Sequence, residues 1–226
     1  MSKPLVVVES PTKVRTIKKY LGSDYKVAAT VGHIKDLPNK EMGIDVEDGF
    51  KPKYQYIPGK QKIVKSLKQA AGDTHDVYLA PDPDREGEAI AWHTADVLKK
   101  KGRNFYRVLF HELTKDSVRK AMTSPEVLDR SKYEAQQARR ILDRLVGYQV
   151  SPLLWRKVKG GLSAGRVQSV AVRIICERER AIQAFVSEEY WSITAHLNSD
   201  VPPPFAAKLV KKDLEKIKIP HAKAAD

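Results

Sequence analysis

The sequence has one cysteine, Cys176, in 226 residues. A single cysteine excludes an internal disulfide and any zinc site built from several cysteines. No apolar run approaches the roughly 20 residues of a membrane-spanning helix. No signal peptide is predicted either, because Met1–Pro4 leads directly into a short strand-like run. These absences favour a cytoplasmic protein with no membrane partner.

Acidic residues are few relative to basic ones. The 28 Asp and Glu against 41 Lys and Arg give a formal net charge of +13 at pH 7, and the isoelectric point is near 9.7. This excess favours a polyanionic partner, nucleic acid first and an anionic membrane surface second. The hydrophobic fraction of 42% is ordinary for a globular protein, and the length allows one large or two modest domains.

Strand and helix patterns alternate from residue 1 to about 113. This alternation predicts an α/β fold with a parallel sheet and helices on both of its faces. The stretch 38–60 is rich in proline and glycine and predicts a long loop or insertion. The predicted strands are 5–8, 26–30, 77–80 and 106–110, and the predicted helices are 13–21, 61–71 and 88–99.

The pattern becomes mainly helical beyond Lys115. Apolar residues recur at helical spacing over 134–148, and a second amphipathic helix is predicted after Ser163. Alternating segments at 190–197 and near 205–210 predict strands. The chain is therefore expected to continue from the α/β part into a helical segment and then into the start of a β-containing region.

Three carboxylates alternate after the predicted strand 77–80: Asp82, Asp84 and Glu86. Alternate residues point to the same side if the backbone stays extended. Carboxylates held that close repel one another, and a hard divalent cation relieves the repulsion. Mg²⁺ suits such a site because it takes few protein ligands and keeps water or phosphate oxygens. The alternative is a solvated acidic turn that caps the next helix.

A second predicted strand also ends in an acid. The run 5–8 is followed by Glu9, and Ser10 and Pro11 then predict a helix start. In an open α/β sheet, ligands bind where the strands end at their carboxyl side. We therefore expect Glu9 and the three carboxylates to meet around one cation.

A strongly basic segment runs from Arg139 to Arg173, and its one acidic residue is Asp143. Arginine forks bind phosphate well, Tyr148 and Trp155 could stack on unpaired bases, and the glycines at 160–165 would let backbone amides approach a phosphate. These features predict a nucleic-acid-binding face. The basic residues are Arg139, Arg140, Arg144, Arg156, Lys157, Lys159, Arg166 and Arg173.

Each of these features has a plainer interpretation. Tyr148 and Trp155 could be core aromatics, and Asp143 could pair with Arg139 or Arg140 along the helix. The glycines could simply shape a turn between helices. These alternatives stay open at the level of sequence.

Four motifs, taken in order, resemble bacterial type IA DNA topoisomerases (topoisomerase I). The resemblance extends from about residue 3 to at least Trp191. The motifs are 7–13 (VVESPTK), 31–38 (VGHIKDLP), 82–88 (DPDREGE) and 163–169 (SAGRVQS), with a linking segment at 136–148 (QQARRILDRLVGY).

The resemblance implies three parts: a Rossmann-like Toprim domain at 3–113, a partial helical domain for single-stranded DNA at 114–187, and the start of a truncated β-containing region at 188–226. It implies Mg²⁺-dependent, ATP-independent relaxation of negatively supercoiled DNA, by cleaving one strand, passing another and resealing. DNA would be the partner of a monomer in the bacterial cytoplasm, at the nucleoid.

The resemblance also assigns site residues. Glu9 would assist proton transfer at the leaving 3′ oxygen and lie near the metal, and Lys13 would offset charge on the scissile phosphate. Asp82 and Asp84 would hold Mg²⁺, with Glu86 completing the acidic cluster. The positions that match DNA contacts are His33, Arg139, Arg140, Asp143, Tyr148, Trp155, Ser163, Ala164, Gly165, Arg166, Val167 and Gln168.

The nucleophile of the family is a tyrosine in a Tyr-x-Arg-Thr-Asp motif, and none of the 9 tyrosines here lies in such a motif. The chain is therefore expected to be an N-terminal fragment that binds Mg²⁺ and single-stranded DNA but does not cleave alone. Two alternatives remain: a self-sufficient Toprim nuclease or primase-like enzyme, and a non-catalytic DNA-binding module.

Overall fold

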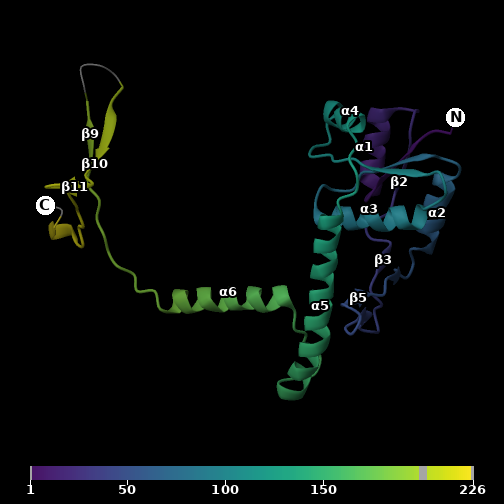
Figure 1. Cartoon of the computed structure of the whole chain (residues 1–226). Coiled ribbons are helices and arrows are strands. Elements are labelled where there is room, and N and C mark those ends of the chain that lie inside the picture. Colours follow the sequence, from purple (N-terminus) through teal and green to yellow (C-terminus); the bar gives the residue numbers. More distant parts are fainter. Residues whose placement is uncertain (1, 199–202, 225–226) are drawn as a thin grey trace. The chain divides into compact units, whose positions relative to one another are not determined.

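The computed structural model describes residues 2–198 and 203–224 (Figure 1). Two compact units are distinguished, one ending at Gln168 and the other beginning at Ser169. The predicted β-containing segment falls in the second unit, and its residues 199–202 and 225–226 lie outside the described part.

The first unit is built on a four-stranded parallel sheet in the order β2-β1-β7-β8. The predicted parallel sheet is confirmed, and its last strand lies slightly earlier in the chain than predicted. The apolar residues Val108 and Phe110 are buried but follow the strand rather than form it. The strands are β1 (Leu5–Val8), β2 (Lys26–Ala29), β7 (Asp76–Leu79) and β8 (Asn104–Arg107).

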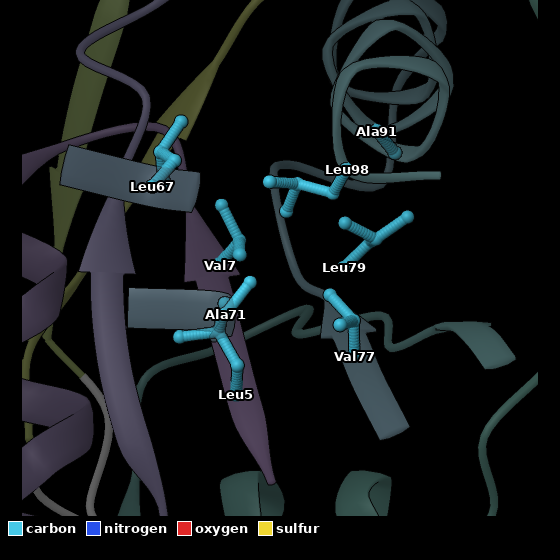
Figure 2. Close-up of a cluster of buried hydrophobic side chains, with 8 residues drawn as sticks. All are labelled: Leu5, Val7, Leu67, Ala71, Val77, Leu79, Ala91 and Leu98. Atoms are coloured by element: carbon cyan, nitrogen blue, oxygen red, sulfur yellow. The ribbon is translucent and has the colours of Figure 1, made fainter. Parts of the chain in front are cut away.

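Helices cover both faces of the sheet, as predicted. Successive side chains of a strand point to opposite faces, so Val6 and Val8 pack with α1 (Pro11–Leu21) and α4 (Lys115–Thr123). Leu5 and Val7 face the other two helices. Those helices are α2 (Gln61–Ala71) and α3 (Arg85–Leu98). Figure 2 shows the core on that side, formed by Leu5, Val7, Leu67, Ala71, Val77, Leu79, Ala91 and Leu98.

The predicted loop at 38–60 contributes strands to two short antiparallel ribbons, one of which also includes a strand just before the loop. One pairs β3 (Lys35–Asp36) with β6 (Gln55–Tyr56), and the other pairs β4 (Ile44–Asp45) with β5 (Lys51–Pro52). Two-residue strands carry no periodicity that a sequence pattern could reveal. The insertion therefore has more regular structure than its composition predicts.

A long helix, α5 (Arg130–Lys157), follows and packs on α3. Figure 1 shows the N-terminal end of α5 beside α3, where the rings of Trp92 and Tyr133 stack with centroids 4.7 Å apart. The helix extends the predicted 134–148 in both directions and continues through Pro152. Pro152 lacks the N–H that would bond to the carbonyl of residue 148, so the helix continues without that hydrogen bond.

The second unit contains most of α6 (Arg166–Gln183) and two antiparallel ribbons. The predicted strand at 190–197 begins only at Thr194. No helix within residues 2–198 and 203–224 has the length and hydropathy to cross a membrane. The ribbons pair β9 (Thr194–Leu197) with β10 (Phe205–Lys208), and β11 (Lys211–Lys212) with β12 (Glu215–Lys216).

Candidate metal and nucleic-acid site

The carboxyl ends of β1 and β7 lie side by side because these strands pair in parallel. Glu9 directly follows β1, and Asp82 lies in the turn after β7. Lys13, from the first turns of α1, reaches both: its Nζ is 2.5 Å from Glu9 Oε1 and 2.5 Å from Asp82 Oδ1. Two strand ends and one helix thus place three of the predicted site residues in contact.

Lys13 carries the positive charge of this cluster. Partial burial alone would lower the pKa of its ammonium group, but the hydrogen bonds to Asp82 and Glu9, with their negative charge, outweigh burial and raise the pKa. Lys13 is therefore protonated at neutral pH. It links the two carboxylates at the edge where an α/β sheet binds its ligands.

The donor set here has the chemistry for a hard cation. Glu9 Oε2 is buried and has no hydrogen-bond partner in the described part of the chain, and carboxylate oxygen is the ligand that Mg²⁺ prefers. Glu9 and Asp82 are thus the residues that could hold a divalent ion. Within residues 2–198 and 203–224, however, no three Asp, Glu, His or Cys side chains are arranged to hold one together.

The carboxylates of Asp84 and Glu86 have other partners. Asp84 caps α3, since its Oδ1 accepts a hydrogen bond from Gly87 N at 2.7 Å. Glu86 Oε2 lies 3.4 Å from His33 Nε2 and accepts a hydrogen bond from Gln136 Nε2 at 3.1 Å. The assumption of an extended backbone does not hold, because α3 already begins at Arg85. The role of Asp84 and Glu86 as metal ligands stays a prediction.

Gly87 allows the acidic turn to approach α3 closely. A Cβ at this position would lie 2.0 Å from the carbonyl oxygen of Asp82 and 2.8 Å from its carbonyl carbon. Both are backbone atoms, which cannot rotate away as a side chain can. Any larger residue at 87 therefore has to displace the turn that carries Asp82.

We expect Gly87→Ala to lower the free energy of unfolding by about 1–3 kcal/mol, the usual cost of overpacking, and to weaken Mg²⁺ binding. Urea unfolding and titration calorimetry would measure the two effects. Gly160→Ala is the matched control, because a Cβ at Gly160 would meet nothing within 4 Å. Equal effects of the two substitutions would contradict this account of the turn.

Next to the acidic turn is a cavity of about 360 Å³. Its walls mix both signs of charge and come from the 33–36 segment, from Tyr54 just before β6, from α3 and from α5. Figure 1 shows α3, α5 and the β3 segment next to one another. The lining residues are His33, Lys35, Asp36, Tyr54, Glu86, His93, Gln136, Arg139, Arg140 and Asp143.

The arginines of this cavity differ in their partners. Arg140 makes a two-pronged ion pair with Asp36, at 2.8 and 2.6 Å. Partial burial raises the pKa of Asp36, but the hydrogen bonds from Arg140 and from Leu37 N outweigh it and lower the pKa. Arg139 Nε is 3.9 Å from Asp143 Oδ2, and its side chain is 39% exposed. The Arg140 side chain is almost equally exposed, at 36%, so the two arginines differ in the length of their ion pairs rather than in accessibility.

Arg144 and Tyr148 fix α5 to the loop that follows β3. Arg144 is buried and donates to the carbonyls of Pro38 and of Glu41, the latter at 2.8 Å. Tyr148 OH donates to Asn39 O at 2.8 Å. Two residues expected on the nucleic-acid-binding face, Arg144 and Tyr148, thus form hydrogen bonds inside the protein. Tyr148 is 38% exposed, so it is not a fully buried core aromatic.

A second cavity, of about 660 Å³, brings together the later predicted residues. Ser163 Oγ donates to Gln168 Oε1 at 3.4 Å, and Ala164 N donates to Ser151 Oγ at 3.0 Å. Trp155 is 51% exposed, which argues against its being a core aromatic. The lining residues are Gly147, Tyr148, Ser151, Pro152, Trp155, Ser163, Ala164, Gly165 and Gln168.

Arg166 and Val167 do not line that cavity. Arg166 Nε donates to Asp143 Oδ1 at 3.1 Å, so Asp143 joins α5 to the start of α6 rather than pairing only along its own helix. The Val167 side chain is exposed. Ten of the twelve predicted DNA-contacting residues thus line two cavities of the first unit, and the exceptions are Arg166 and Val167.

Several residues of the site are not predicted from the sequence. Gln136 contacts Glu86, and the buried pair Glu88 and Arg107 lies behind the acidic turn. Gln136 belongs to the 136–148 segment, but no role was predicted for it. Glu88 ends the 82–88 motif, but its burial depends on Arg107, 19 residues later, and no local pattern reveals that partner.

Comparisons with known proteins extend this description. Residues 4–113 match the family model of the Toprim domain, whose members typically bind a divalent metal, and residues 127–225 match a model described as DNA topoisomerase. The solved structure of full-length topoisomerase I from Thermotoga maritima, in a monoclinic crystal form, is 43% identical with a TM-score of 0.76. The match covers 98% of this chain and 36% of that one, so the chain spans about a third of that protein's length. The chain therefore belongs to the type IA DNA topoisomerase family and corresponds to its N-terminal region, which contains the Toprim domain.

Proposed function

We propose that the chain supplies the metal-binding and strand-binding part of an enzyme that relaxes negatively supercoiled DNA. The proposed reaction is Mg²⁺-dependent and ATP-independent: one strand is cleaved, another passes, and the first is resealed. The observation that carries the proposal is the Glu9–Lys13–Asp82 cluster at two adjacent strand ends. Glu86, four residues after Asp82, lines a cavity together with Arg139 and Arg140.

The proposed roles follow from charge. When bound, Mg²⁺ would offset the negative charge that gathers on the phosphate in the transition state. Lys13 would add a second positive charge at the scissile phosphate, and Glu9 would exchange a proton with the leaving 3′ oxygen. Asp82 and Glu9 would hold the metal. Asp84 and Glu86 would complete the acidic cluster through their second carboxylate oxygens, because the hydrogen bonds from Gly87 N and Gln136 Nε2 use one oxygen of each.

We propose that a single strand of DNA lies along the two cavities of the first unit. The partners at the first cavity would be His33, Arg139 and Arg140. At the second, the Trp155 ring could stack on a base, since base–aromatic stacking tolerates any sequence. The supporting observations are the exposure of Arg139 and Trp155. The other proposed contacts are Asp143, Tyr148, Ser163, Ala164, Gly165, Arg166, Val167 and Gln168.

Arg139→Ala is expected to weaken oligo(dT) binding and to reduce the slope of log affinity against log salt by about one unit, because one phosphate is no longer neutralised. Fluorescence anisotropy at several salt concentrations would measure both. Arg130→Ala is the control on the same helix, because Arg130 is 79% exposed, paired with Glu134 and outside the cavity. A salt slope that is unchanged by Arg139→Ala would contradict the proposed path.

We propose that no tyrosine of this chain is the nucleophile. Burial raises the pKa of Tyr54 to about 12 and also raises the pKa values of Tyr78 and Tyr133. A raised pKa disfavours the phenolate that would attack a phosphate. For the other six tyrosines the argument is that none lies in a Tyr-x-Arg-Thr-Asp motif. The nucleophile of the proposed enzyme would be a tyrosine in such a motif outside these residues.

Supercoiled plasmid incubated with the chain and Mg²⁺ is accordingly expected to stay supercoiled, as gel electrophoresis would show. Robust relaxation would refute the assignment of the nucleophile. Nicking or degradation that disappears in Asp82→Ala would instead favour a self-sufficient Toprim nuclease. The same proposal places the protein, as a monomer, at the chromosomal DNA in a bacterial cytoplasm.

A further inference from the structure

Behind the acidic turn lies an ion pair with almost no access to solvent. Arg107, at the end of β8, donates from Nε to Glu88 Oε2 of α3 at 2.7 Å, and both side chains are 1% exposed. Burying two charges costs several kcal/mol per ion, and their attraction seldom returns more than that cost. The attraction between the two charges alone therefore does not account for an ion pair at this buried position.

The remaining donors of Arg107 hold the backbone that leads to the acidic turn. Nη1 donates to Leu79 O at 3.1 Å and to Pro81 O at 2.8 Å, and Nη2 donates to Asp82 O at 2.5 Å. These carbonyls span the end of β7 and the first carboxylate of the turn. A planar guanidinium fixes several acceptors at once, which a lysine cannot do.

The second oxygen of Glu88 holds the start of α5. Glu88 Oε1 accepts a hydrogen bond from Asp129 N at 2.8 Å, and Asp129 in turn caps α5 by accepting from Lys132 N at 3.0 Å. The backbone of Arg107 pairs with that of Glu126 through two hydrogen bonds of 2.8 Å. One buried pair is therefore connected both to the turn that carries Asp82 and to the helix that carries Arg139.

We infer that Arg107 and Glu88 are positioning residues that fix the acidic turn and the first turn of α5 in one arrangement. This inference rests on the proposed function, since it assigns the pair a role in metal and strand binding. Partners behind a ligand commonly set its orientation and thereby its affinity for the metal. Neither residue touches the ion or the DNA; both act through Asp82 and through α5.

The test compares two arginines of the same kind. Arg103 also binds backbone carbonyls, donating to Thr74 O at 3.0 Å, Leu98 O at 2.6 Å and Gly72 O at 2.7 Å, but none of these belongs to the acidic turn. Arg107→Lys, Arg103→Lys and Glu88→Gln would be made in the whole chain. Titration calorimetry with MgCl₂ and anisotropy with labelled oligo(dT) would follow, well below each variant's unfolding temperature.

We expect Arg107→Lys to weaken Mg²⁺ binding roughly 10–100-fold, the usual effect of losing a partner behind a metal ligand. Glu88→Gln keeps the size of the side chain but removes the charge that orients Arg107, so it should weaken the binding of both Mg²⁺ and oligo(dT). Arg103→Lys should lower the unfolding temperature without changing either affinity. This difference between the arginines is one that a merely structural role would not produce.

Three results would overturn the inference. Mg²⁺ affinity unchanged in Arg107→Lys would show that the carbonyl contacts do not set the turn. Equal losses of Mg²⁺ affinity in Arg107→Lys and Arg103→Lys would show that the effect is general destabilisation of the fold. No Mg²⁺ binding by the unsubstituted chain would overturn the proposed metal site itself, and the inference with it.

Discussion

Glu88→Ala is expected to lower the free energy of unfolding by about 3–5 kcal/mol, because it leaves the Arg107 charge buried without its counterion. It also removes the acceptor of Asp129 N. Urea unfolding followed by circular dichroism would measure the loss. An effect of this size would be a large fraction of the stability of an ordinary domain.

Glu134→Ala is the matched control for that measurement. The Glu134–Arg130 pair has the same Nε–Oε distance, 2.7 Å, as the Glu88–Arg107 pair, but its side chains are 53% and 79% exposed. Exposed pairs usually contribute about 0–1 kcal/mol. A similar loss of unfolding free energy in the two variants would show that burial does not determine how much the Glu88–Arg107 ion pair stabilises the protein.

The double variant Arg107→Met with Glu88→Leu separates the contribution of the buried charges to stability from that of the hydrogen bonds to the backbone carbonyls. Apolar replacement of a buried ion pair often restores stability. Here we expect only part of the loss to be recovered, because the carbonyls of Pro81 and Asp82 also lose their donor. Full recovery would mean that those hydrogen bonds contribute little to stability.

The second large effect is the pH dependence that His93 gives to stability. Burial, with smaller contributions from the charges of His33 and Lys35, lowers the pKa of His93 from 6.5 to about 4. The unfolded chain therefore takes up a proton near pH 6.5, whereas the folded chain does so only near pH 4. At about 1.4 kcal/mol per pKa unit, the folded state loses about 3 kcal/mol as the pH falls through this range.

His93→Phe is expected to remove most of that loss. Both ring nitrogens of His93 are buried without hydrogen-bond partners in the described part of the chain, so a phenyl ring sacrifices no hydrogen bond. The ring contact with Tyr54, at 4.7 Å between centroids, can be kept. Urea unfolding at pH 7, 6, 5 and 4 would give the two profiles.

The control for this prediction is His111→Phe, because His111 is exposed. Its profile should follow that of the unsubstituted chain between pH 7 and pH 4. If His93→Phe loses stability with acid as steeply as the unsubstituted chain, another group accounts for the pH dependence. The expected difference is largest at pH 4, where the unfolded state of the unsubstituted chain carries the extra proton.

Sequence patterns located most of the elements of the α/β part because burial and periodicity are local properties. The run 5–8 is β1, and α2 begins and ends where its apolar spacing predicts, at Gln61 and Ala71. The helix after the acidic turn was predicted to start at residue 88 but begins at Arg85, because the Asp84 side chain caps it. Because of this shift, Glu86 has helical rather than extended geometry, and its carboxylate does not point to the same side as those of Asp82 and Asp84 by simple alternation.

The basic segment shows where local reasoning stops. Arg139, Arg140 and Arg144 look alike in the sequence, yet their partners differ. Arg139 has a long ion pair with Asp143 on its own helix, Arg140 has a short one with Asp36, and Arg144 is buried against loop carbonyls. Asp36 and the carbonyls come from a segment about a hundred residues earlier. No spacing within a helix can reveal such partners, because they depend on how distant segments pack.

The sequence by itself determined the parallel sheet, the family and the residue types at the strand ends, because hydrophobic periodicity and motifs are written along the chain. Only the tertiary structure decided which charged side chains form ion pairs within the protein and which can bind a ligand. It placed Lys13 between Glu9 and Asp82 and buried Glu88 with Arg107. The physical reason is that charges interact through space: a partner far away in sequence decides whether a carboxylate is a ligand, a cap or a buried counterion.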